Sequence, residues 1–209
     1  MEFIFQKLKN YTPTILDEES YRRYGILIPL VKKEDGIHVL FEVRSLELKS
    51  QPGEICFPGG GLEETDRTPM DTAIRETSEE LGIDEKYIQD VYPVDYFVQP
   101  MEKRMIFPFV GKIERFDLIR PNPGEVKEIF TVPLSYLKEQ TPEKHRLDFQ
   151  VADNDHFPFH LIPGGRNYPW KPRAITEYFY FYKDYIIWGL TAKILHHFLH
   201  LIYGRSRSG

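Results

Sequence analysis

Residues 59–83 read GGGLEETDRTPMDTAIRETSEELGI, and this stretch decides how the rest of the chain is interpreted. Thr68 can cap a helix, because its side-chain oxygen accepts a hydrogen bond from a free backbone N–H group of the first turn. Pro69 suits the first helical position, Asp71 can complete a reciprocal cap, and Gly82 is a common stop. The stretch therefore predicts a glycine-rich turn followed by one helix that ends just before this last glycine.

One side of the predicted helix is acidic. At about 100° per residue, Glu76, Glu79 and Glu80 share a face that is separate from the packing stripe. The stripe consists of Met70, Ala73, Ile74, Thr77 and Leu81. Neighbouring like charges destabilise an isolated helix by roughly 0.2–0.5 kcal/mol per pair, so a positive group is expected beside the glutamates.

The turn before the helix decides between two interpretations of this acidic face. A solvated face with Arg75 nearby is the ordinary interpretation of three glutamates on a helix. Residues 57–61 (FPGGG) favour another, because a backbone without Cβ atoms can approach a ligand or offer a carbonyl oxygen to it. Mg²⁺ and Mn²⁺ select such hard oxygen ligands. The pattern therefore indicates a ligand site rather than a solvated face.

The spacing of these residues resembles a family signature. The pattern Gly60-x5-Asp66-x8-Arg75-Glu76-x2-Glu79-Glu80-x-Gly82-Ile83 is similar to that of the Nudix hydrolases. The family normally has Glu in place of Asp66, and seven rather than eight residues before the Arg-Glu pair. The loop of this chain is therefore one residue longer. Counting from Gly61 restores the length but places Arg67 at the acidic position.

The longer loop also resembles that of one branch of the family, the coenzyme A diphosphatases. Residues 40–45 (LFEVRS), followed by Gly53 and residues 57–60 (FPGG), look like the accessory motif of that branch. Residues 187–192 (IWGLTA) are similar to it as well. The resemblance implies hydrolysis of coenzyme A or its derivatives at the internal diphosphate, which gives 4′-phosphopantetheine and adenosine 3′,5′-bisphosphate.

The resemblance also implies which residues hold the metal ion and the substrate. Glu76, Glu79 and Glu80 would hold Mg²⁺ or Mn²⁺. A backbone carbonyl of the glycine loop would help them, and we assign this carbonyl to Gly60. Gly59 and Gly60 would also approach the substrate. A bound metal ion neutralises diphosphate oxygens and lowers the pKa of an attacking water molecule.

Five further residues belong to the candidate site. Arg75 is expected to hold the neighbouring glutamates by charge-assisted hydrogen bonds rather than to contact phosphate. Asp66 either ties the loop to the helix or is a solvated loop acid. Arg44 follows an apolar strand, and it either binds a substrate phosphate or forms a salt bridge at the rim. In this family a further carboxylate often comes from a loop outside the signature, and the candidates here are Glu125 and Glu128.

The flanking sequence predicts an α/β fold. Two apolar runs around a turn, residues 24–32 and 36–44, predict a hairpin. Other expectations are a loop, a brief strand and a loop over residues 51–62, two strands within 89–113 around a turn at 99–104, a surface loop over 116–128, a strand at 129–132, a short helix from Pro133, a strand near 175–181 and a terminal helix from Tyr185. Together they predict an α/β sandwich with a mixed sheet. The family resemblance implies that this is a Nudix-like α/β/α sandwich. We expect one domain over residues 1–209, with its core at about 22–140, an N-terminal arm and a C-terminal strand-helix extension.

Composition disfavours several classes of protein. The net charge of −5 provides no basic face, so no nucleic-acid partner is expected. The sequence has no apolar stretch long enough to span a bilayer, and its start lacks the pattern of a secretion signal. We therefore expect a cytoplasmic protein without a membrane partner. Cys56 is the only cysteine, which excludes an intramolecular disulfide. Because dimers are common in the family it resembles, a homodimer is expected.

Two alternatives stay open at this point. A Nudix hydrolase that acts on ADP-ribose, a dinucleoside polyphosphate or another nucleoside diphosphate derivative would carry the same signature. A sensor with this fold would bind a nucleotide without turnover. The complete set of Glu76, Glu79 and Glu80 disfavours a loss of catalysis, and no helix-turn-helix segment with a basic face supports a regulator.

Overall fold

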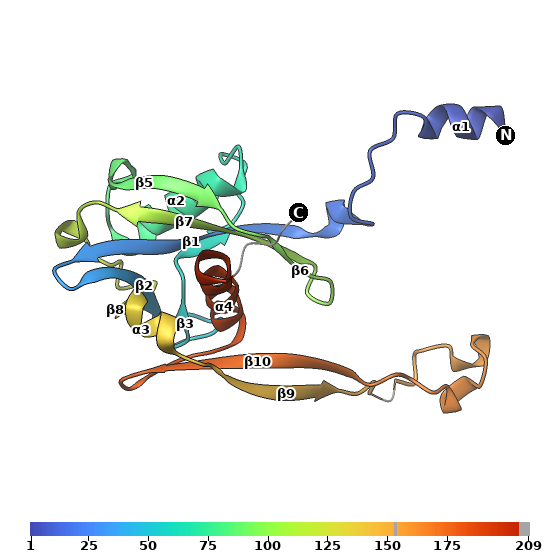
Figure 1. Ribbon diagram of the computed structural model, residues 1–209. Coiled ribbons are helices and arrows are strands. Elements are labelled where there is room, and N and C mark those ends of the chain that lie inside the picture. Colours follow the sequence, from blue (N-terminus) through green and yellow to red (C-terminus); the bar gives the residue numbers. More distant parts are fainter. Residues whose placement is uncertain (153, 205–209) are drawn as a thin grey trace.

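The computed structural model describes residues 1–152 and 154–204 as a layered α/β structure (Figure 1). Its elements in chain order are α1 (Glu2–Leu8), β1 (Arg22–Lys33), β2 (Gly36–Arg44), β3 (Ile55–Cys56), β4 (Gly59–Gly61), α2 (Pro69–Leu81), β5 (Ile88–Pro93), β6 (Phe97–Gln99), β7 (Arg104–Ile113), β8 (Val126–Pro133), α3 (Leu134–Glu139), β9 (Glu143–Phe149), β10 (Arg173–Tyr182), β11 (Tyr185–Ile187) and α4 (Gly189–Tyr203). In the described part of the chain, an eight-stranded sheet contains β1 to β8, and a three-stranded sheet contains β9 to β11.

Strand β1 is the centre of the larger sheet. It pairs antiparallel with β2, where Leu30 lies opposite Val39, so the predicted hairpin is confirmed. On its other side β1 pairs parallel with β7 over ten residue pairs, from Arg22 opposite Arg104 to Val31 opposite Ile113. The sheet is therefore mixed, as the sequence predicts.

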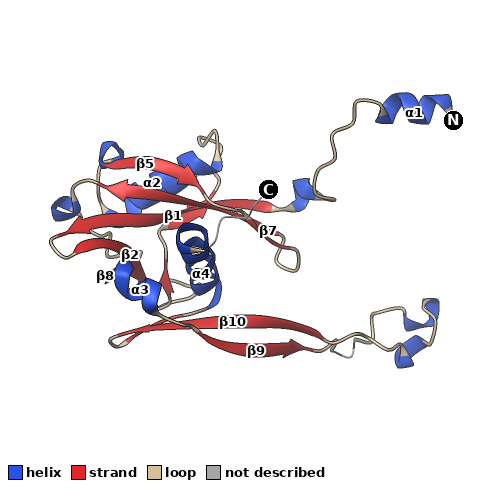
Figure 2. Cartoon of the chain, viewed as in Figure 1, coloured by secondary structure: helices blue, strands red, loops and turns tan. Residues whose placement is uncertain are grey.

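The larger sheet separates two apolar cores. Leu27 of β1 packs in one cluster with Leu81 of α2. The next residue, Ile28, points to the other side and packs in a cluster with Leu195 of α4. Strands covered on both faces read as nearly continuous apolar runs, as β1 and β2 do. The helices on the two faces complete the predicted α/β/α sandwich (Figure 2).

Helix α2 begins and ends where the sequence predicts. The Thr68 side chain accepts a hydrogen bond from Asp71 N, and the Asp71 carboxylate accepts one from Thr68 N at 2.9 Å. Gly82 ends the helix in the left-handed conformation at φ +58°. The helix also lies very close to β1, since a Cβ atom on Gly25 would stand 2.0 Å from the Pro69 carbonyl oxygen. This close approach fixes the acidic helix against the sheet.

Several expected elements differ from the structure. Residues 59–61 form β4 instead of a loop, and three strands rather than two occupy residues 88–113. Strand β8 begins at Val126, so Glu128 lies in a strand and not in the expected surface loop. Strand β11 precedes α4, which begins at Gly189 instead of Tyr185, and β9 is an additional strand. These strands depend on pairing with distant residues, which local sequence does not reveal.

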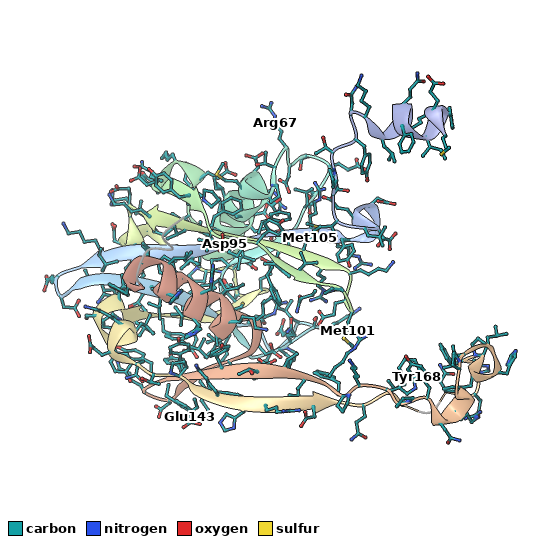
Figure 3. The ribbon with its side chains drawn as sticks, turned by 45° about the vertical axis from the view of Figure 1, so that its right-hand side comes forward. Arg67, Asp95, Met101, Met105, Glu143 and Tyr168 are labelled. Carbon is teal, nitrogen blue, oxygen red and sulfur yellow. The ribbon has the colours of Figure 1, made fainter. Side chains whose placement is uncertain are left out.

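Two segments extend from the body of the molecule in Figure 1. Helix α1 stands apart at the N-terminal end and has no buried residue. The ribbon of β9 and β10 leaves the body and leads to a loop region around Tyr168, which Figure 3 labels. Helix α4, of 15 residues, is too short to cross a bilayer, as is every other helix in residues 1–152 and 154–204.

Candidate active site

The glycine turn lies directly against the acidic face of α2. In β4, Gly60 pairs with Gly25 of β1. A Cβ atom on Gly60 would stand 2.2 Å from Glu76 Oε1, so only glycine leaves room for this carboxylate. The backbone N–H of Gly59 donates a hydrogen bond to Glu80 Oε2 at 2.8 Å. The structure thus brings together the four residues predicted at the junction of turn and helix.

Arg75 ties the loop to the helix through three carboxylates. Its Nε and Nη2 donate to the two Asp66 oxygens at 3.1 and 3.0 Å. Nη2 also donates to Glu76 Oε1, and Nη1 donates to Glu79 Oε2, each at 3.0 Å. Hydrogen bonds from Arg75 lower the pKa of Asp66 to about 2, and Asp66 raises the pKa of Arg75 in turn. These contacts fit the scaffold role predicted for Arg75.

Asp66 connects the long loop to the first turns of α2. Besides Arg75, it accepts hydrogen bonds from Thr72 Oγ1 and from the backbone N–H of Glu63, each at 3.0 Å. Its side chain is only 4% exposed. Of the two interpretations of Asp66, the structure therefore favours the tie between loop and helix over the solvated acid.

A buried pair of carboxylates lies behind this network, and one of its members was not predicted. Glu80 is 5% exposed and Glu42, in β2, is 1% exposed. Burial raises the pKa of Glu80 to about 9, with a further contribution from the negative charge of Glu42. Burial likewise raises the pKa of Glu42 to about 7. The protons of such a pair leave in two steps that belong to both groups.

Cys56 accompanies this pair as a packing and hydrogen-bonding residue. Glu42 lies opposite Cys56 in the β2–β3 ladder, and the thiol donates a hydrogen bond to Glu42 Oε1 at 3.1 Å. Burial raises the pKa of the thiol, and the neighbouring Glu42 raises it further, so Cys56 stays protonated. The other Glu42 oxygen, Oε2, is buried without a hydrogen-bond partner among the described residues.

The structure distinguishes the two candidate carboxylates from outside the signature. The negative charge of Glu125 contributes to the raised pKa values of Glu42, Glu76 and Glu80, so it lies close to the carboxylate group. Glu128 instead lies opposite Val43 in the sheet, and its charge acts on Tyr185. Glu125 therefore joins the candidate site, whereas Glu128 borders the groove on the other face of the sheet.

Arg44 lies at the edge of the site. Burial raises the pKa of both Glu42 and Cys56, and the positive charge of Arg44 offsets part of this rise, which places Arg44 near the buried carboxylate pair. Its guanidinium makes long hydrogen bonds to the Ser50 carbonyl oxygen, two at 3.4 Å. The sequence suggested a substrate phosphate or a salt bridge at the rim as the partner of Arg44, and this backbone carbonyl oxygen is neither. Substrate binding by Arg44 stays a prediction.

The donor chemistry of the site fits a divalent cation, although the donors are not gathered. Within the described ranges, no three acidic, histidine or cysteine side chains converge at metal-binding distance. Arg75 holds Glu79, Gly59 holds Glu80, and Cys56 holds one oxygen of Glu42. The unpartnered Glu42 oxygen and the raised pKa values show carboxylates that lack a compensating positive charge. Hard oxygen donors of this kind match Mg²⁺ or Mn²⁺.

Gly60→Ala is expected to lower kcat/KM about 10- to 100-fold by displacing the Glu76 carboxylate from its position, because misplacing a catalytic group by about 1 Å has effects of this size. Glu76 can move aside, so the melting temperature should change little. Gly61→Ala is the matched control, since its Cβ atom would meet only the Tyr24 ring at 3.8 Å. Equal activity of the two variants would show that the position of Glu76 is unimportant.

The sequence of residues 21–151, more than half of the chain, matches the NUDIX domain. The chain is 36% identical over 117 residues to peroxisomal coenzyme A diphosphatase NUDT7 of Mus musculus, covering 56% of this chain and 49% of that protein. It is 33% identical over 187 residues to mitochondrial Nudix hydrolase 15 of Arabidopsis thaliana, covering 86% of this chain and 58% of that protein. The chain thus spans about half to three fifths of these two relatives.

Other matches agree on the fold. Nudix hydrolase NudL of Photorhabdus laumondii, whose function is uncharacterized, is 29% identical over 181 residues, covering 85% of this chain and 83% of that protein. A crystal structure of a MutT/nudix family protein from Enterococcus faecalis matches with a TM-score of 0.52 and 15% identity, covering 96% of this chain and 68% of that chain. With its capped acidic helix, its glycine turn and its matching domain, this chain belongs to the Nudix hydrolase family.

Proposed function

We propose that this chain hydrolyses the diphosphate linkage of coenzyme A or its derivatives, giving 4′-phosphopantetheine and adenosine 3′,5′-bisphosphate. The observation that carries the reaction class is the group of carboxylates formed by Glu42, Glu76, Glu80 and Glu125 beside the glycine turn. The substrate is supported by the longer loop and by the likeness to a relative named as a coenzyme A diphosphatase. Members of the family generally use a divalent cation and act on small nucleotide substrates.

The proposed reaction is substitution at phosphorus by water. Mg²⁺ or Mn²⁺, when bound, supplies charge neutralisation at the diphosphate and a lower pKa for water. Glu76, Glu79 and Glu80 would hold this ion, together with the carbonyl oxygen of Gly60. Arg75 fixes the orientation of Glu76 and Glu79 through its guanidinium. The hydrogen bond from Gly59 N–H to Glu80 Oε2 would hold this carboxylate at a fixed position relative to the glycine backbone while the substrate binds.

The sheet separates these residues from an aromatic groove on its other face. A groove of about 850 Å³ lies between β3, β8 and the turn that joins β10 to β11. Val43 and Ile55, which border it, adjoin Glu42 and Cys56 in the paired strands, so their side chains point to the opposite face. The rings of Phe130 and Tyr185 stack there with centroids 3.7 Å apart.

Arg44 is the proposed phosphate-binding residue beside the carboxylates. It ends β2, follows Val43 of the groove and lies one residue further from Glu42. Its hydrogen bonds to Ser50 are long, so the guanidinium can exchange them for a phosphate. Arg44 would direct the diphosphate toward Glu80.

Product analysis tests this proposal. The protein is incubated with Mg²⁺ or Mn²⁺ and with coenzyme A, ADP-ribose or a diadenosine polyphosphate in parallel, and the products are separated by chromatography. We expect 4′-phosphopantetheine from coenzyme A, at a kcat/KM about tenfold or more above that for the other substrates, which corresponds to a difference of about 1.4 kcal/mol in the activation free energy. Glu79→Gln should lose most of this turnover.

Each result of that comparison has a distinct meaning. Efficient cleavage of ADP-ribose without cleavage of coenzyme A would contradict the substrate but keep the reaction class. Wild-type turnover of Glu79→Gln would contradict the metal-binding role of this residue. Tight nucleotide binding without turnover of any substrate would instead support a sensor. A cytoplasmic location, expected from the sequence, is also part of the proposal. The two relatives differ in this respect, because one is named as a peroxisomal and the other as a mitochondrial protein.

A further inference from the structure

A groove of about 460 Å³ lies at the margin of the larger sheet, beside the glycine turn. Its lining includes Gly61 of the turn and Arg22 and Tyr24 of β1. In the described part of the chain, β4 pairs with β1 alone, so its other edge is a margin at which the two faces of the sheet meet. Gly60, which adjoins the Glu76 carboxylate, directly precedes Gly61. A molecule held at the carboxylates can therefore reach this groove around the edge of the sheet.

The Tyr24 ring connects the glycine turn to two arginines. Tyr24 lies opposite Gly61 in the β1–β4 ladder, and a Cβ atom on Gly61 would stand 3.8 Å from the ring. The guanidinium of Arg104 lies 5.5 Å from the centre of the same ring. Arg22 lies opposite Arg104 where β1 and β7 run side by side (Figure 1), so both side chains leave the sheet on the face to which Tyr24 points. Arg22 and Arg104 therefore form an arginine pair beside this ring.

Neither member of the arginine pair is fully compensated by a carboxylate. Arg22 is exposed, and its side chain forms no ion pair or hydrogen bond with a residue of the described ranges. Arg104 contacts Glu102 at 3.4 Å, and both of these side chains are about half exposed. Exposed ion pairs of this kind contribute little stability, so a ligand can replace this one. Because like charges on neighbouring strands repel, an anion between Arg22 and Arg104 would stabilise both.

The neighbouring charged side chains leave the arginine pair available to an anion. Arg23 and Glu18 form an ion pair at 2.7 Å, and Lys103 and Asp17 form one at 3.3 Å. Glu19, which also lines the groove, is exposed, so water and salt screen its charge. The arginine pair therefore carries the positive charge that remains for a ligand at this end of the sheet.

A phosphate monoester fits the arginine pair in charge and in shape. A guanidinium donates two parallel hydrogen bonds to phosphate oxygens, and a phosphate monoester carries a charge of about −1.5 to −2 at pH 7, close to that of two guanidinium groups in size. Gly60 and Arg22 lie on adjacent strands and three residues apart along them, which corresponds to roughly 11 Å between their Cα atoms. A long arginine side chain covers part of this distance, so one nucleotide can place a phosphate at each position.

We propose that the arginine pair binds the 3′-phosphate of coenzyme A while the diphosphate lies at the carboxylates beside Gly60. This inference rests on the proposed function and adds the group that selects the substrate, since neither ADP-ribose nor a diadenosine polyphosphate carries a phosphate on a ribose 3′ oxygen. The Tyr24 ring positions the Arg104 guanidinium for this contact. The product adenosine 3′,5′-bisphosphate keeps the phosphate, so it would bind to the same two arginines.

Dephospho-coenzyme A, which lacks only the 3′-phosphate, tests this site. With Mg²⁺, the wild type should cleave coenzyme A with a kcat/KM about 10- to 100-fold above that for dephospho-coenzyme A. Arg22→Met and Arg104→Met should each remove most of this preference by slowing cleavage of coenzyme A alone. Lys112→Met is the matched control, because it removes one positive charge from the other end of β7, opposite Leu30. Equal kcat/KM for the two substrates in the wild type, or equal preferences of Arg22→Met and Lys112→Met, would overturn the inference, although cleavage of coenzyme A would still support the proposed function.

Nucleotide binding separates this inference from the proposed function, because it requires no turnover. Isothermal titration calorimetry with Mg²⁺ should show that the wild type binds adenosine 3′,5′-bisphosphate about tenfold or more tightly than adenosine 5′-monophosphate. The double variant Arg22→Met/Arg104→Met should bind the two nucleotides equally, and circular dichroism verifies that it is folded. If coenzyme A is not cleaved but this difference is present and is lost in the double variant, the site is supported and the proposed function fails. Equal binding of the two nucleotides by the wild type would overturn the site.

Discussion

Glu80→Gln is expected to lower metal-dependent kcat/KM by about 100- to 1000-fold and, at the same time, to stabilise the metal-free protein. The carboxylate is buried beside Glu42, so its charge is costly without a cation. Glutamine has the same shape, and its carbonyl oxygen can still accept the hydrogen bond from Gly59. We expect the free energy of unfolding at pH 8 in EDTA to rise by about 2 kcal/mol.

The pH dependence of stability gives a second measurement on the same residue. Below its ordinary pKa of 4.5, the Glu80 carboxyl is protonated in both the folded and the unfolded chain, so it does not disfavour folding. As the pH rises toward 9, the unfolded chain loses this proton while the folded chain keeps it. The free energy of unfolding of the metal-free wild type should therefore fall between about pH 5 and pH 9. The fall should be smaller in Glu80→Gln.

Metal binding should reverse this loss of stability in the wild type. Mg²⁺ binds the ionised carboxylates, so it should raise the melting temperature more at pH 8 than at pH 6. Glu42→Gln is the informative second variant, because removing its charge should lower the pKa of Glu80 and move the metal response to lower pH. Thermal shift with and without Mg²⁺ measures this. Identical pH and Mg²⁺ responses of wild type and Glu80→Gln would contradict the assignment.

The acidic helix was predictable because its information is local. Thr68, Pro69 and Gly82 fix its ends by hydrogen bonding and backbone conformation within a few residues. The spacing of Glu76 and Glu80 then fixes their angular relation on the helix, whatever the rest of the chain does. The α/β sandwich with a mixed sheet followed from the interspersed strand-like and helix-like segments, whereas the helical layers on both faces followed from the family resemblance.

Glu42 was not predicted because its role depends on the strand pairing. The only local signal is a single acidic residue within the apolar run of β2, residues 39–43 (VLFEV). Its position beside Cys56 and near Glu80 exists only once β3 pairs with β2 and α2 packs on the sheet. For the same reason the sequence could not choose between Glu125 and Glu128. Glu125 lies just before β8 and Glu128 lies within it, and the start of this strand depends on its pairing.

Arg75→Met is expected to destabilise the protein by about 3 kcal/mol, because it removes the cation that three carboxylates share. The Asp66 side chain would be left almost fully buried with its charge uncompensated. In a chain of this size, the melting temperature should fall by about 6–12 °C. Arg67→Met, in the same loop, is the matched control. Arg67 is exposed, has no ion pair with a described residue, and points away from the body in Figure 3.

The double variant Asp66→Asn/Arg75→Met identifies the cause of this loss. If the orphaned Asp66 charge is the main penalty, removing it together with Arg75 should recover part of the stability, and the two changes should be strongly non-additive. Urea unfolding of the wild type, the two single variants and the double variant measures the coupling. Additive losses would mean that Arg75 stabilises the loop through Glu76, Glu79 or the Gly61 carbonyl instead of through Asp66. Asp66, at the acidic position of the longer loop, would then be replaceable, although the site would still require Arg75.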